Sequence, residues 1–433
     1  MAEPGASQLS DHEPIYRRNF GFFLLDNILF NLAMNIISPT TIIPDFIRHL
    51  TNSEVLIGIS SSMFDVGWTL PQLFIARYIV LSERKKWWFV GPNILVRIMM
   101  LVFATFTVIL GKDRSEAILV AFLICYGIAA FGDGIVGVPW AVLAGTSLDS
   151  RWRARMLGLT TVSVGVIMLG VSPLVGIILG SKGLAFPNNY ALIFCIAGLI
   201  FALSIMPILF VHELPGGKVA EKIPTLGEFL PGLGHILRMD TAFRSMIIAR
   251  MMTSLFTMAS PFYIGFATVQ LGLSSTVAVP TLLVMQTIGA VSGALIFTWM
   301  GARRNLLFIR MSLGLAALVP VSALLAAKIG PLPLYFGFLV LGLTIGNSFS
   351  GFQNWIISYA TPDQRPLYTG LFNTVSAAVS LIVPFIGGTI VQQIGYEAVF
   401  VTALAMVLAA FFVTLRYIHE PRTQKSIEIA AVD

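Results

Sequence analysis

The sequence predicts an all-helical membrane protein whose twelve transmembrane helices form two pseudo-symmetric six-helix bundles. Of its 433 residues, 56% are hydrophobic and 11% are charged. The mean hydropathy of +0.86 exceeds what the core of a soluble protein requires. Apolar runs of about 20 residues, long enough to cross about 30 Å of hydrocarbon as a helix, recur along the chain. These long uniform runs exclude the short alternating strands of a membrane β-barrel.

Two groups of six apolar runs account for most of the chain. The predicted spans cover residues 19–44, 54–80, 87–111, 116–146, 156–180, 189–211, 243–271, 275–300, 304–327, 333–358, 367–392 and 396–418. We expect bundle domains at 19–211 and 243–418, joined by a central loop at 212–242 that contains a short amphipathic helix. The ends at 1–18 and 419–433 are polar tails, and we expect the first to be disordered up to the membrane.

Two stretches 214 residues apart share one layout. Each has a Gly and a polar residue inside an apolar run, then a short D-x-R hairpin, then a Gly that opens the next run. The residues that match at this distance are Gly132 with Gly346, Asp133 with Asn347, Asp149 with Asp363, and Arg151 with Arg365; Gly370 opens the next run as Gly158 does, at a distance of 212 residues. Such a long internal repeat is typical of transporters that are built from two related halves.

The distribution of Lys and Arg predicts the topology, because cytoplasmic loops retain these residues. With the amino terminus inside, nineteen of them fall on inner segments and five on outer ones. We therefore expect both termini and the central loop to be cytoplasmic. The absence of N-x-S/T glycosylation sites fits a bacterial plasma (inner) membrane. The formal charge of +6 follows from this topology and does not indicate nucleic-acid binding.

Three acidic residues, Asp26, Asp65 and Asp133, lie inside predicted spans. A carboxylate at that depth is costly, so each is a candidate for coupling transport to protons. Glycines flank Asp133 on both sides and let a neighbouring helix or ligand approach, so we rank Asp133 first and Asp26 second. The alternative is a permanent structural pair with Arg97 in the third span, the predicted charge partner of Asp65 or Asp133.

Polar side chains in other spans predict the walls of a substrate cavity. Asn27, Asn31 and Asn35 share one face of the first span; the alternative is an interhelical hydrogen-bond seam. The candidates in the second half are Arg250, Asn347, Gln353, Asn354 and Trp355. Acids lie deep in the first half and amides at comparable places in the second. We therefore expect the first half to handle protons or a cationic group and the second to bind substrate.

Two basic turns occupy equivalent places in the halves. They hold Arg84, Lys85 and Lys86 between spans 2 and 3, and Gly301, Arg303 and Arg304 between spans 8 and 9. Together with the span count, the duplication and the D-x-R hairpins, this layout resembles the major facilitator superfamily over residues 18–418. The turns lack the Asp of that family's signature. SPLVGI at Ser172–Ile177 and VPFIGG at Val383–Gly388 are partial copies of the G-P-x-x-G-G signature of the family's proton-coupled exporters. The signature of the fourth helix in those exporters includes an arginine, and this chain has Leu123 at that place.

The resemblance implies an alternating-access carrier with spans 1, 4, 7 and 10 around a midplane cavity. We predict a secondary transporter, coupled to protons or another ion, that moves a small organic molecule, with export favoured. The alternatives are a proton-coupled importer of a polar metabolite and, more remotely, a non-transporting sensor. We expect no enzymatic activity, because FGDG around Asp133 departs from the G-x-G-D motif of intramembrane proteases and no Walker motif occurs.

A cytoplasmic gate is predicted after spans 4 and 10, formed by Asp149, Arg151, Asp363 and Arg365. We expect no metal or other cofactor, because the five histidines lie in tails, loops or helix ends and the two cysteines lie in different spans. The expected partners are the small-molecule substrate, the coupling ion and the lipid bilayer, without nucleic acid, and we expect a monomer.

Overall fold

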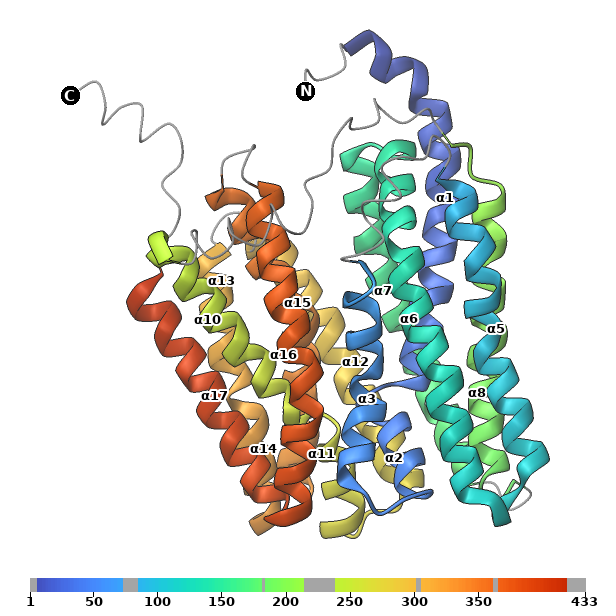
Figure 1. Ribbon diagram of the computed structural model, residues 1–433, viewed down its shortest axis with the longest axis vertical. Helices are drawn as coiled ribbons and strands as arrows, with labels where there is room; N and C mark the ends of the chain where they lie inside the picture. The colour runs from blue at the N-terminus through green and yellow to red at the C-terminus, as the bar shows by residue number, and fades with distance from the viewer. Residues whose placement is uncertain are drawn as a thin grey trace. The chain divides into compact units, whose positions relative to one another are not determined.

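The computed structural model describes residues 6–72, 85–180, 184–213, 238–300, 305–360 and 365–418. The regular structure of these residues is helical throughout, which confirms the predicted fold class (Figure 1). The chain forms two compact units. Unit 1 comprises Met1–Ile223 and Leu273–Val284, and unit 2 comprises Pro224–Gly272 and Met285–Asp433.

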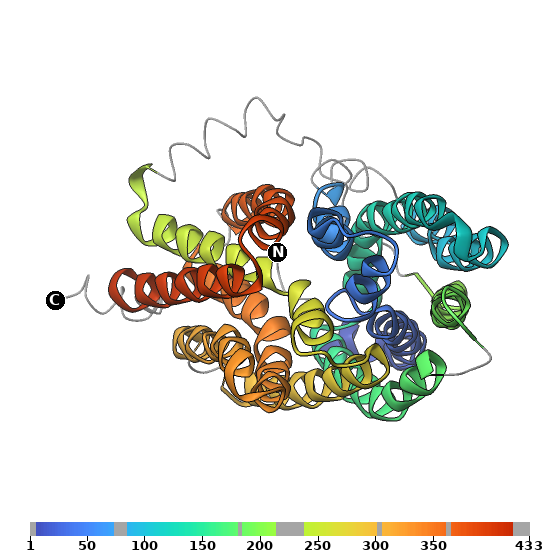
Figure 2. The same ribbon diagram turned by 90° about the horizontal axis from the view of Figure 1, so that it is seen from below.

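Unit 1 holds the helices of the first predicted bundle. They are α1 (Ala6–Ile37), α2 (Ile42–Arg48), α3 (Glu54–Thr69), α5 (Lys86–Leu110), α6 (Ser115–Ser147), α7 (Ser150–Gly180) and α8 (Asn188–Leu209). α1 packs on α7 and α8, α5 packs on α6 and α8, and α3 packs on α6. Seen end-on, these helices form a bundle in which neighbours in space are often distant in sequence (Figure 2).

Unit 2 holds the helices of the second predicted bundle. They are α10 (Thr241–Phe256), α11 (Phe262–Gly265), α12 (Ser275–Met300), α13 (Asn305–Ala316), α14 (Leu318–Ile329), α15 (Leu332–Tyr359), α16 (Arg365–Gln393) and α17 (Tyr396–Tyr417). The first part of α12, up to Val284, belongs to unit 1 and the rest to unit 2. Within unit 2, α10 packs on α16 and α17, and α15 packs on α13 and α14.

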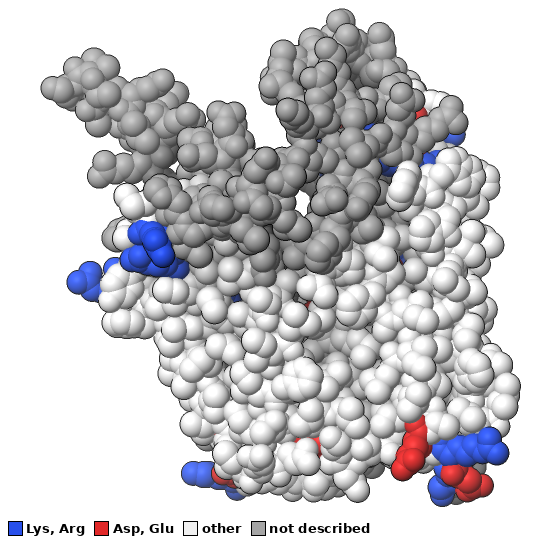
Figure 3. Space-filling model, in the orientation of Figure 1, with Lys and Arg blue, Asp and Glu red and all other residues white. Residues whose placement is uncertain are grey.

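Ten segments of the described chain are helical, long and apolar enough to cross a membrane. Predicted spans 2 and 10 are not among them: α3 has 16 residues, and α15 provides a shorter apolar segment at Leu332–Thr344. The order of helices is consistent with twelve spans. Described Lys, Arg, Asp and Glu side chains gather near the helix ends in Figure 3, with an uncharged surface between them. This distribution suits helices that face lipid.

The ring of Phe46 in α2 is the centre of an aromatic cluster in unit 1. Its neighbours, with ring centroids 5.1–6.0 Å away, are Phe103, Phe122, Phe186, Tyr190 and Phe194. The adjacent Asp45 is 1% exposed. Its carboxylate accepts hydrogen bonds from the hydroxyls of Tyr190 (2.6 Å) and Ser275 (3.0 Å). Through these contacts α2 holds together the beginnings of α8 and α12.

Glycines let one pair of helices approach closely in each unit. A Cβ at Gly134 in α6 would overlap the carbonyl oxygen of Gly67 in α3. A Cβ at Gly289 in α12 would likewise overlap the carbonyl oxygen of Leu339 in α15, and Gly342 faces α12 in the same way. These helices are the second and fourth spans of each half. The repeat in the sequence is therefore also a repeat in packing.

Three features differ from the sequence predictions. The first tail was expected to be disordered over 1–18, but α1 begins at Ala6; the adjoining membrane helix removes the cost of nucleating these turns. The seventh span is broken before Pro261, which cannot donate a backbone hydrogen bond. The ninth is broken at Ala317, because Pro320 leaves the preceding carbonyls without their helical donor. The amphipathic helix expected in the central loop lies outside the described residues.

Gly134→Ala is expected to destabilise unit 1 by about 1–3 kcal/mol, because the added methyl group meets the backbone of α3 and forces the helices apart. Thermal unfolding in detergent should show a lower midpoint. Gly145→Ala is the matched control on the same helix, since no atom lies within 4 Å of its new methyl group. Equal midpoints for the two variants would contradict the close packing of α3 and α6.

Candidate ion-coupling site in unit 1

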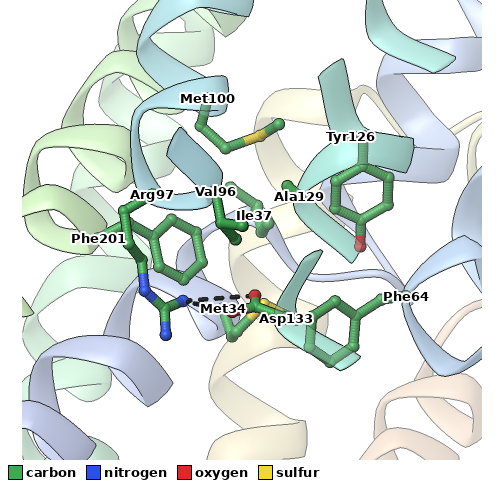
Figure 4. Close-up of a pocket in the computed structure, with 10 residues that line it drawn as sticks. All are labelled: Met34, Ile37, Phe64, Val96, Arg97, Met100, Tyr126, Ala129, Asp133 and Phe201. Carbon is green, nitrogen blue, oxygen red and sulfur yellow. Dashed lines mark hydrogen bonds and ion pairs between the residues drawn. The ribbon is translucent and has the colours of Figure 1, made fainter. Parts of the chain in front are cut away.

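A small pocket inside unit 1 is lined by side chains from α1, α3, α5, α6 and α8 (Figure 4). Its cavity volume is about 10 Å³, which is room for about one water molecule. Three lining side chains are polar: Arg97, Tyr126 and Asp133. The others are Met34, Ile37, Phe64, Val96, Met100, Ala129 and Phe201. A few polar groups in an apolar wall are the usual composition of a binding pocket.

Glycines on both sides of Asp133 bring α6 close to its neighbours. A Cβ at Gly132 would overlap the side chain of Val96 in α5, and Gly134 meets the backbone of α3. A larger residue at either position would separate the helices and widen the space around the carboxylate. The sequence FGDG therefore places Asp133 in a narrow gap between α3 and α5.

The guanidinium of Arg97 lies against the carboxylate of Asp133. Its Nη1 is 3.1 Å from Oδ1 and 3.3 Å from Oδ2, and the two side chains are 6% and 5% exposed. The guanidinium carbon is also 4.3 Å from the ring centre of Phe30 and 5.4 Å from that of Phe201, within the range of cation–π attraction. Of the two partners predicted for Arg97, the structure places Asp133 beside it, whereas Asp65 is exposed on α3.

Asp26 makes a second buried polar contact in unit 1. It is 3% exposed, and its Oδ2 accepts a hydrogen bond from Nε1 of Trp140 at 2.9 Å. Both Arg97 and Asp133 act electrostatically on Asp26. The two acidic residues that the sequence ranks first and second therefore belong to one charged group centred on Arg97.

Several polar atoms around Arg97 are buried without a hydrogen-bond partner among the described residues. They are Oδ1 of Asp26, both amide atoms of Asn93, Nε of Arg97, the hydroxyl of Tyr126 and Oδ1 of Asp133. The last lies at ion-pair distance from Arg97 without hydrogen-bond geometry. Buried polar atoms are nearly always paired, and each unpaired one costs about 1–3 kcal/mol. This concentration indicates a place for water, an ion or a ligand.

The amide stripe of α1 bonds largely to its own helix. The Nδ2 atoms of Asn27, Asn31 and Asn35 donate to the carbonyl oxygens four residues earlier at 2.8–3.2 Å. Asn27 also lies 3.8 Å from the sulfur of Met156 in α7. Burial falls along the stripe, from Asn27 at 9% exposure to an exposed Asn35. These amide bonds stay within α1 and do not form an interhelical hydrogen-bond seam. The role of the stripe as a cavity wall stays a prediction.

The polar candidates of unit 2 are dispersed. Arg250 is half-buried, its Nε donates to the hydroxyl of Ser376 at 3.3 Å, and its guanidinium carbon lies 5.9 and 5.7 Å from the ring centres of Phe352 and Phe372. Trp355 is 1% exposed and stacks on Tyr359 at 4.4 Å, which is a core position. The remaining candidates on α15 are an exposed Asn354, and Asn347 and Gln353, whose side chains the structure does not describe.

The predicted cytoplasmic gate stays a prediction. Asp149 is half-buried in the turn between α6 and α7, and Arg151 is exposed in the first turn of α7. Asp363 lies outside the described residues, and the side chain of Arg365 is not described. Among the described residues, no group of three His, Cys, Asp or Glu side chains is placed to hold a metal ion.

Three residues of this region were not predicted from the sequence: Asn93, Tyr126 and Trp140. Tyr126 and Trp140 stand seven residues before and after Asp133, and seven residues make nearly two helical turns. Asn93 stands four residues before Arg97, one turn away on the same face of α5. The available signal was therefore helical spacing from the two charged residues that had been recognised.

Comparison with known proteins bears on the fold. The Major Facilitator Superfamily family model matches residues 287–433, and no curated protein matches the chain. Among solved structures, the nucleoside transporter NupG aligns over 93% of this chain and 100% of its own, with a TM-score of 0.69 and 14% identity. The chain has the major facilitator superfamily fold.

Two further solved structures extend this comparison. The human organic anion transporter MFSD10 aligns over 93% of this chain and 100% of its own, with a TM-score of 0.62 and 18% identity. A D-xylose-proton symporter aligns over 94% and 98%, with a TM-score of 0.64 and 13% identity. The resemblance predicted from the sequence is confirmed. Identities this low show a shared fold alone, because one fold serves many substrates.

Replacing Arg97 by Met alone is expected to destabilise the protein by about 3–5 kcal/mol, because Asp133 is left as an unpaired buried charge. The double variant with Asp133→Asn should recover much of this loss. Unfolding of the single and double variants in detergent gives the coupling energy.

The control for this cycle is the Arg48–Glu54 pair, which is 2.6 Å apart and 15% and 13% exposed. Its coupling should be smaller, because exposure to solvent screens a pair and lowers the cost of breaking it. Additive effects at Arg97 and Asp133 would show that the two side chains are independent.

Proposed function

We propose that this protein is a secondary active transporter that moves a small organic molecule by alternating access, with protons as the coupling ion and export as the favoured direction. The observation that carries the proposal is the buried Arg97–Asp133 pair, which lies in an internal pocket beside unpaired polar atoms. Ionisable residues inside membrane helices generally mark ion or substrate pathways. A buried ion pair also adds little to the stability of the folded protein, because well-packed apolar residues in its place give equal or greater stability.

Protonation of Asp133 supplies the coupling step. The proton removes the negative charge that holds Arg97, and the guanidinium remains between Phe30 and Phe201 with its charge free to act on Asp26 or on a ligand. Loss of the proton restores the pair. Breaking a buried pair costs about 3–5 kcal/mol, and about 5.5 kcal/mol moves a two-state equilibrium from 1:99 to 99:1. The free energy of breaking the pair is therefore comparable to the free energy needed to shift the equilibrium between two transport conformations.

The size of the pocket separates the coupling site from the substrate site. With a cavity volume of about 10 Å³ it has room for about one water molecule, far less than the 300–1,000 Å³ typical of small-molecule sites. We assign the coupling ion to it and expect the substrate in the midplane cavity, with Asn27, Asn31 and Arg250 among the candidate contacts. Export is favoured by the partial exporter signatures. The alternative, proton-coupled import of a polar metabolite, is favoured by the likeness to a D-xylose-proton symporter.

A ligand panel tests the substrate class. Nucleosides, organic anions and pentoses are the classes named for the similar structures. A ligand present at 100 times its Kd should stabilise the folded protein by about 2.7 kcal/mol in thermal unfolding. Uptake and efflux of the stabilising compound in proteoliposomes then separate a carrier from a sensor, which binds without moving its ligand.

Asp133→Asn is expected to keep substrate exchange and to abolish accumulation driven by a proton gradient, because the amide cannot release a proton. Proteoliposomes with an imposed pH difference measure accumulation, and preloaded vesicles without one measure exchange. Asp113→Asn is the matched control, since Asp113 is exposed in the turn between α5 and α6. Uphill transport by Asp133→Asn at the wild-type rate would sink the assignment.

A further inference from the structure

One face of α6 carries a polar or amphipathic side chain at every seventh position: Tyr126, Asp133, Trp140 and Ser147. Because seven residues turn the helix nearly twice, these side chains lie in a line with steps of about 10 Å. Tyr126, Asp133 and Ser147 are at most 3% exposed. The line therefore runs through the interior of unit 1.

α1 and α5 supply polar groups at matching levels of this line. Arg97 of α5 meets both Asp133 and Phe30 of α1. One turn before Arg97 is Asn93, and one turn before Phe30 is Asp26, which accepts a hydrogen bond from Trp140. Both helices run in the same direction in Figure 1. Asn93 and Asp26 consequently lie at the next level, between Asp133 and Trp140 along the line.

The unpaired atoms lie along this line, on both sides of Asp133. Six buried atoms of Tyr126, Asp133, Arg97, Asn93 and Asp26 have no hydrogen-bond partner among the described residues. Asn93 is 0% exposed and neither of its amide atoms is bonded. The hydroxyl of Tyr126 points into the pocket, toward the side formed by Phe64 and Asp133 (Figure 4). Buried groups left this way are the usual partners of internal water, which makes about three hydrogen bonds per molecule.

We propose that a line of bound water inside unit 1 carries protons past Asp133 to Asp26, with Tyr126 holding the water on the pocket side of Asp133 and Asn93 holding the water between Asp133 and Asp26. The inference rests on the proposed proton coupling and adds to it a second carboxylate, a route between the two, and two positioning residues. Water is required because residues about one to two turns apart cannot pass a proton directly.

The transfer balances without any further reactant. The carboxyl of Asp133 gives its proton to a bound water, each water passes one proton onward, and the carboxylate of Asp26 accepts the last. Asp133 becomes the anion and Asp26 becomes neutral. Arg97 keeps its charge throughout and acts electrostatically on both carboxylates, so it stabilises whichever of them is ionised.

The path is closed beyond Asp26. An apolar cluster that includes Phe23, Leu143, Ala144 and Met156 packs around Trp140 before the line reaches Ser147. A proton that arrives at Asp26 is therefore held there in this conformation. A coupled transporter requires such a block, because an open path would let protons leak without moving substrate.

Radiolytic labelling tests the water directly. X-ray pulses on the full-length protein in lipid nanodiscs turn bound water into hydroxyl radicals that oxidise adjacent side chains. Tyr126 and Tyr190 are 1% and 2% exposed, but the hydroxyl of Tyr190 is bonded to Asp45. We expect Tyr126 to be oxidised at least ten-fold faster than Tyr190. Equal rates would overturn the proposal.

Hydrogen–deuterium exchange tests the route. After mixing into D2O at a pH where both carboxyls are protonated, infrared bands assigned through Asp26→Asn and Asp133→Asn report the exchange of each group. Asn93→Leu should slow exchange at Asp26 at least ten-fold and leave Asp133 unchanged, and Asn93→Gln should restore it. Thr107→Val is the control on the same helix, since Thr107 is buried with its hydroxyl bonded to Phe103. An unchanged rate at Asp26 in Asn93→Leu would overturn the route.

A dry site predicts the opposite pattern. Removing an unsatisfied amide from a dry core raises the unfolding midpoint, so a more stable Asn93→Leu with wild-type exchange contradicts the path. If Asn93→Leu does not fold, Tyr126→Phe tests the water on the pocket side of Asp133 through the oxidation of Met100. Met100 lines the same pocket as Tyr126 and should be labelled several-fold less; unchanged labelling would overturn the proposal. None of these measurements involves transport. A labelled path in a protein without gradient-driven uptake would therefore refute the proposed function and retain the water path.

Discussion

The permanent positive charge of Arg97 dominates the interior of unit 1. A guanidinium cannot lose its proton inside a protein, so the surrounding helices must supply compensation. Asp133 provides an opposite charge, Phe30 and Phe201 provide ring faces, and Asp26 lies within electrostatic reach. The close helix contacts at Gly132 and Gly134 hold the carboxylate of Asp133 against this guanidinium.

The two units share a scaffold and differ in polar chemistry. Close glycine contacts join the second and fourth spans of each unit, and in each an arginine lies beside two phenylalanine rings. Arg97 bonds to a carboxylate, whereas Arg250 donates to the hydroxyl of Ser376. Asp26 and Asp133 lie buried in the first half, as the sequence predicted. The division of labour expected from the sequence, with protons handled by the first half and substrate bound by the second, stays a prediction.

The helices and the charged pair were predictable from sequence, and the positions of the polar neighbours were not. Hydropathy identifies a membrane helix whatever its partners, because the bilayer forces internal hydrogen bonding. Asp26, Arg97 and Asp133 were recognisable because charge is rare at that depth. The choice of Asp133 over Asp65 depends on the rotation of α3 and α5 about their axes, which no periodicity shows. Asn93 and Trp140 resemble ordinary residues until their neighbours are known. The breaks in spans 7 and 9 had a visible cause in proline, yet proline also occurs inside unbroken helices here, such as Pro139 in α6.

The bonds of Asp45 have a consequence for the order in which the chain is completed during synthesis. Asp45 of α2 accepts a hydrogen bond from Ser275, and Leu273–Val284 belongs to unit 1 although some fifty residues of unit 2 precede it in the chain. When the ribosome has made the first six spans, the carboxylate of Asp45 still lacks one of its two hydroxyl partners. The first bundle therefore finishes folding only after the eighth span has been inserted. If the gene were divided in the central loop, the second fragment would contain Leu273–Val284, which belongs to unit 1.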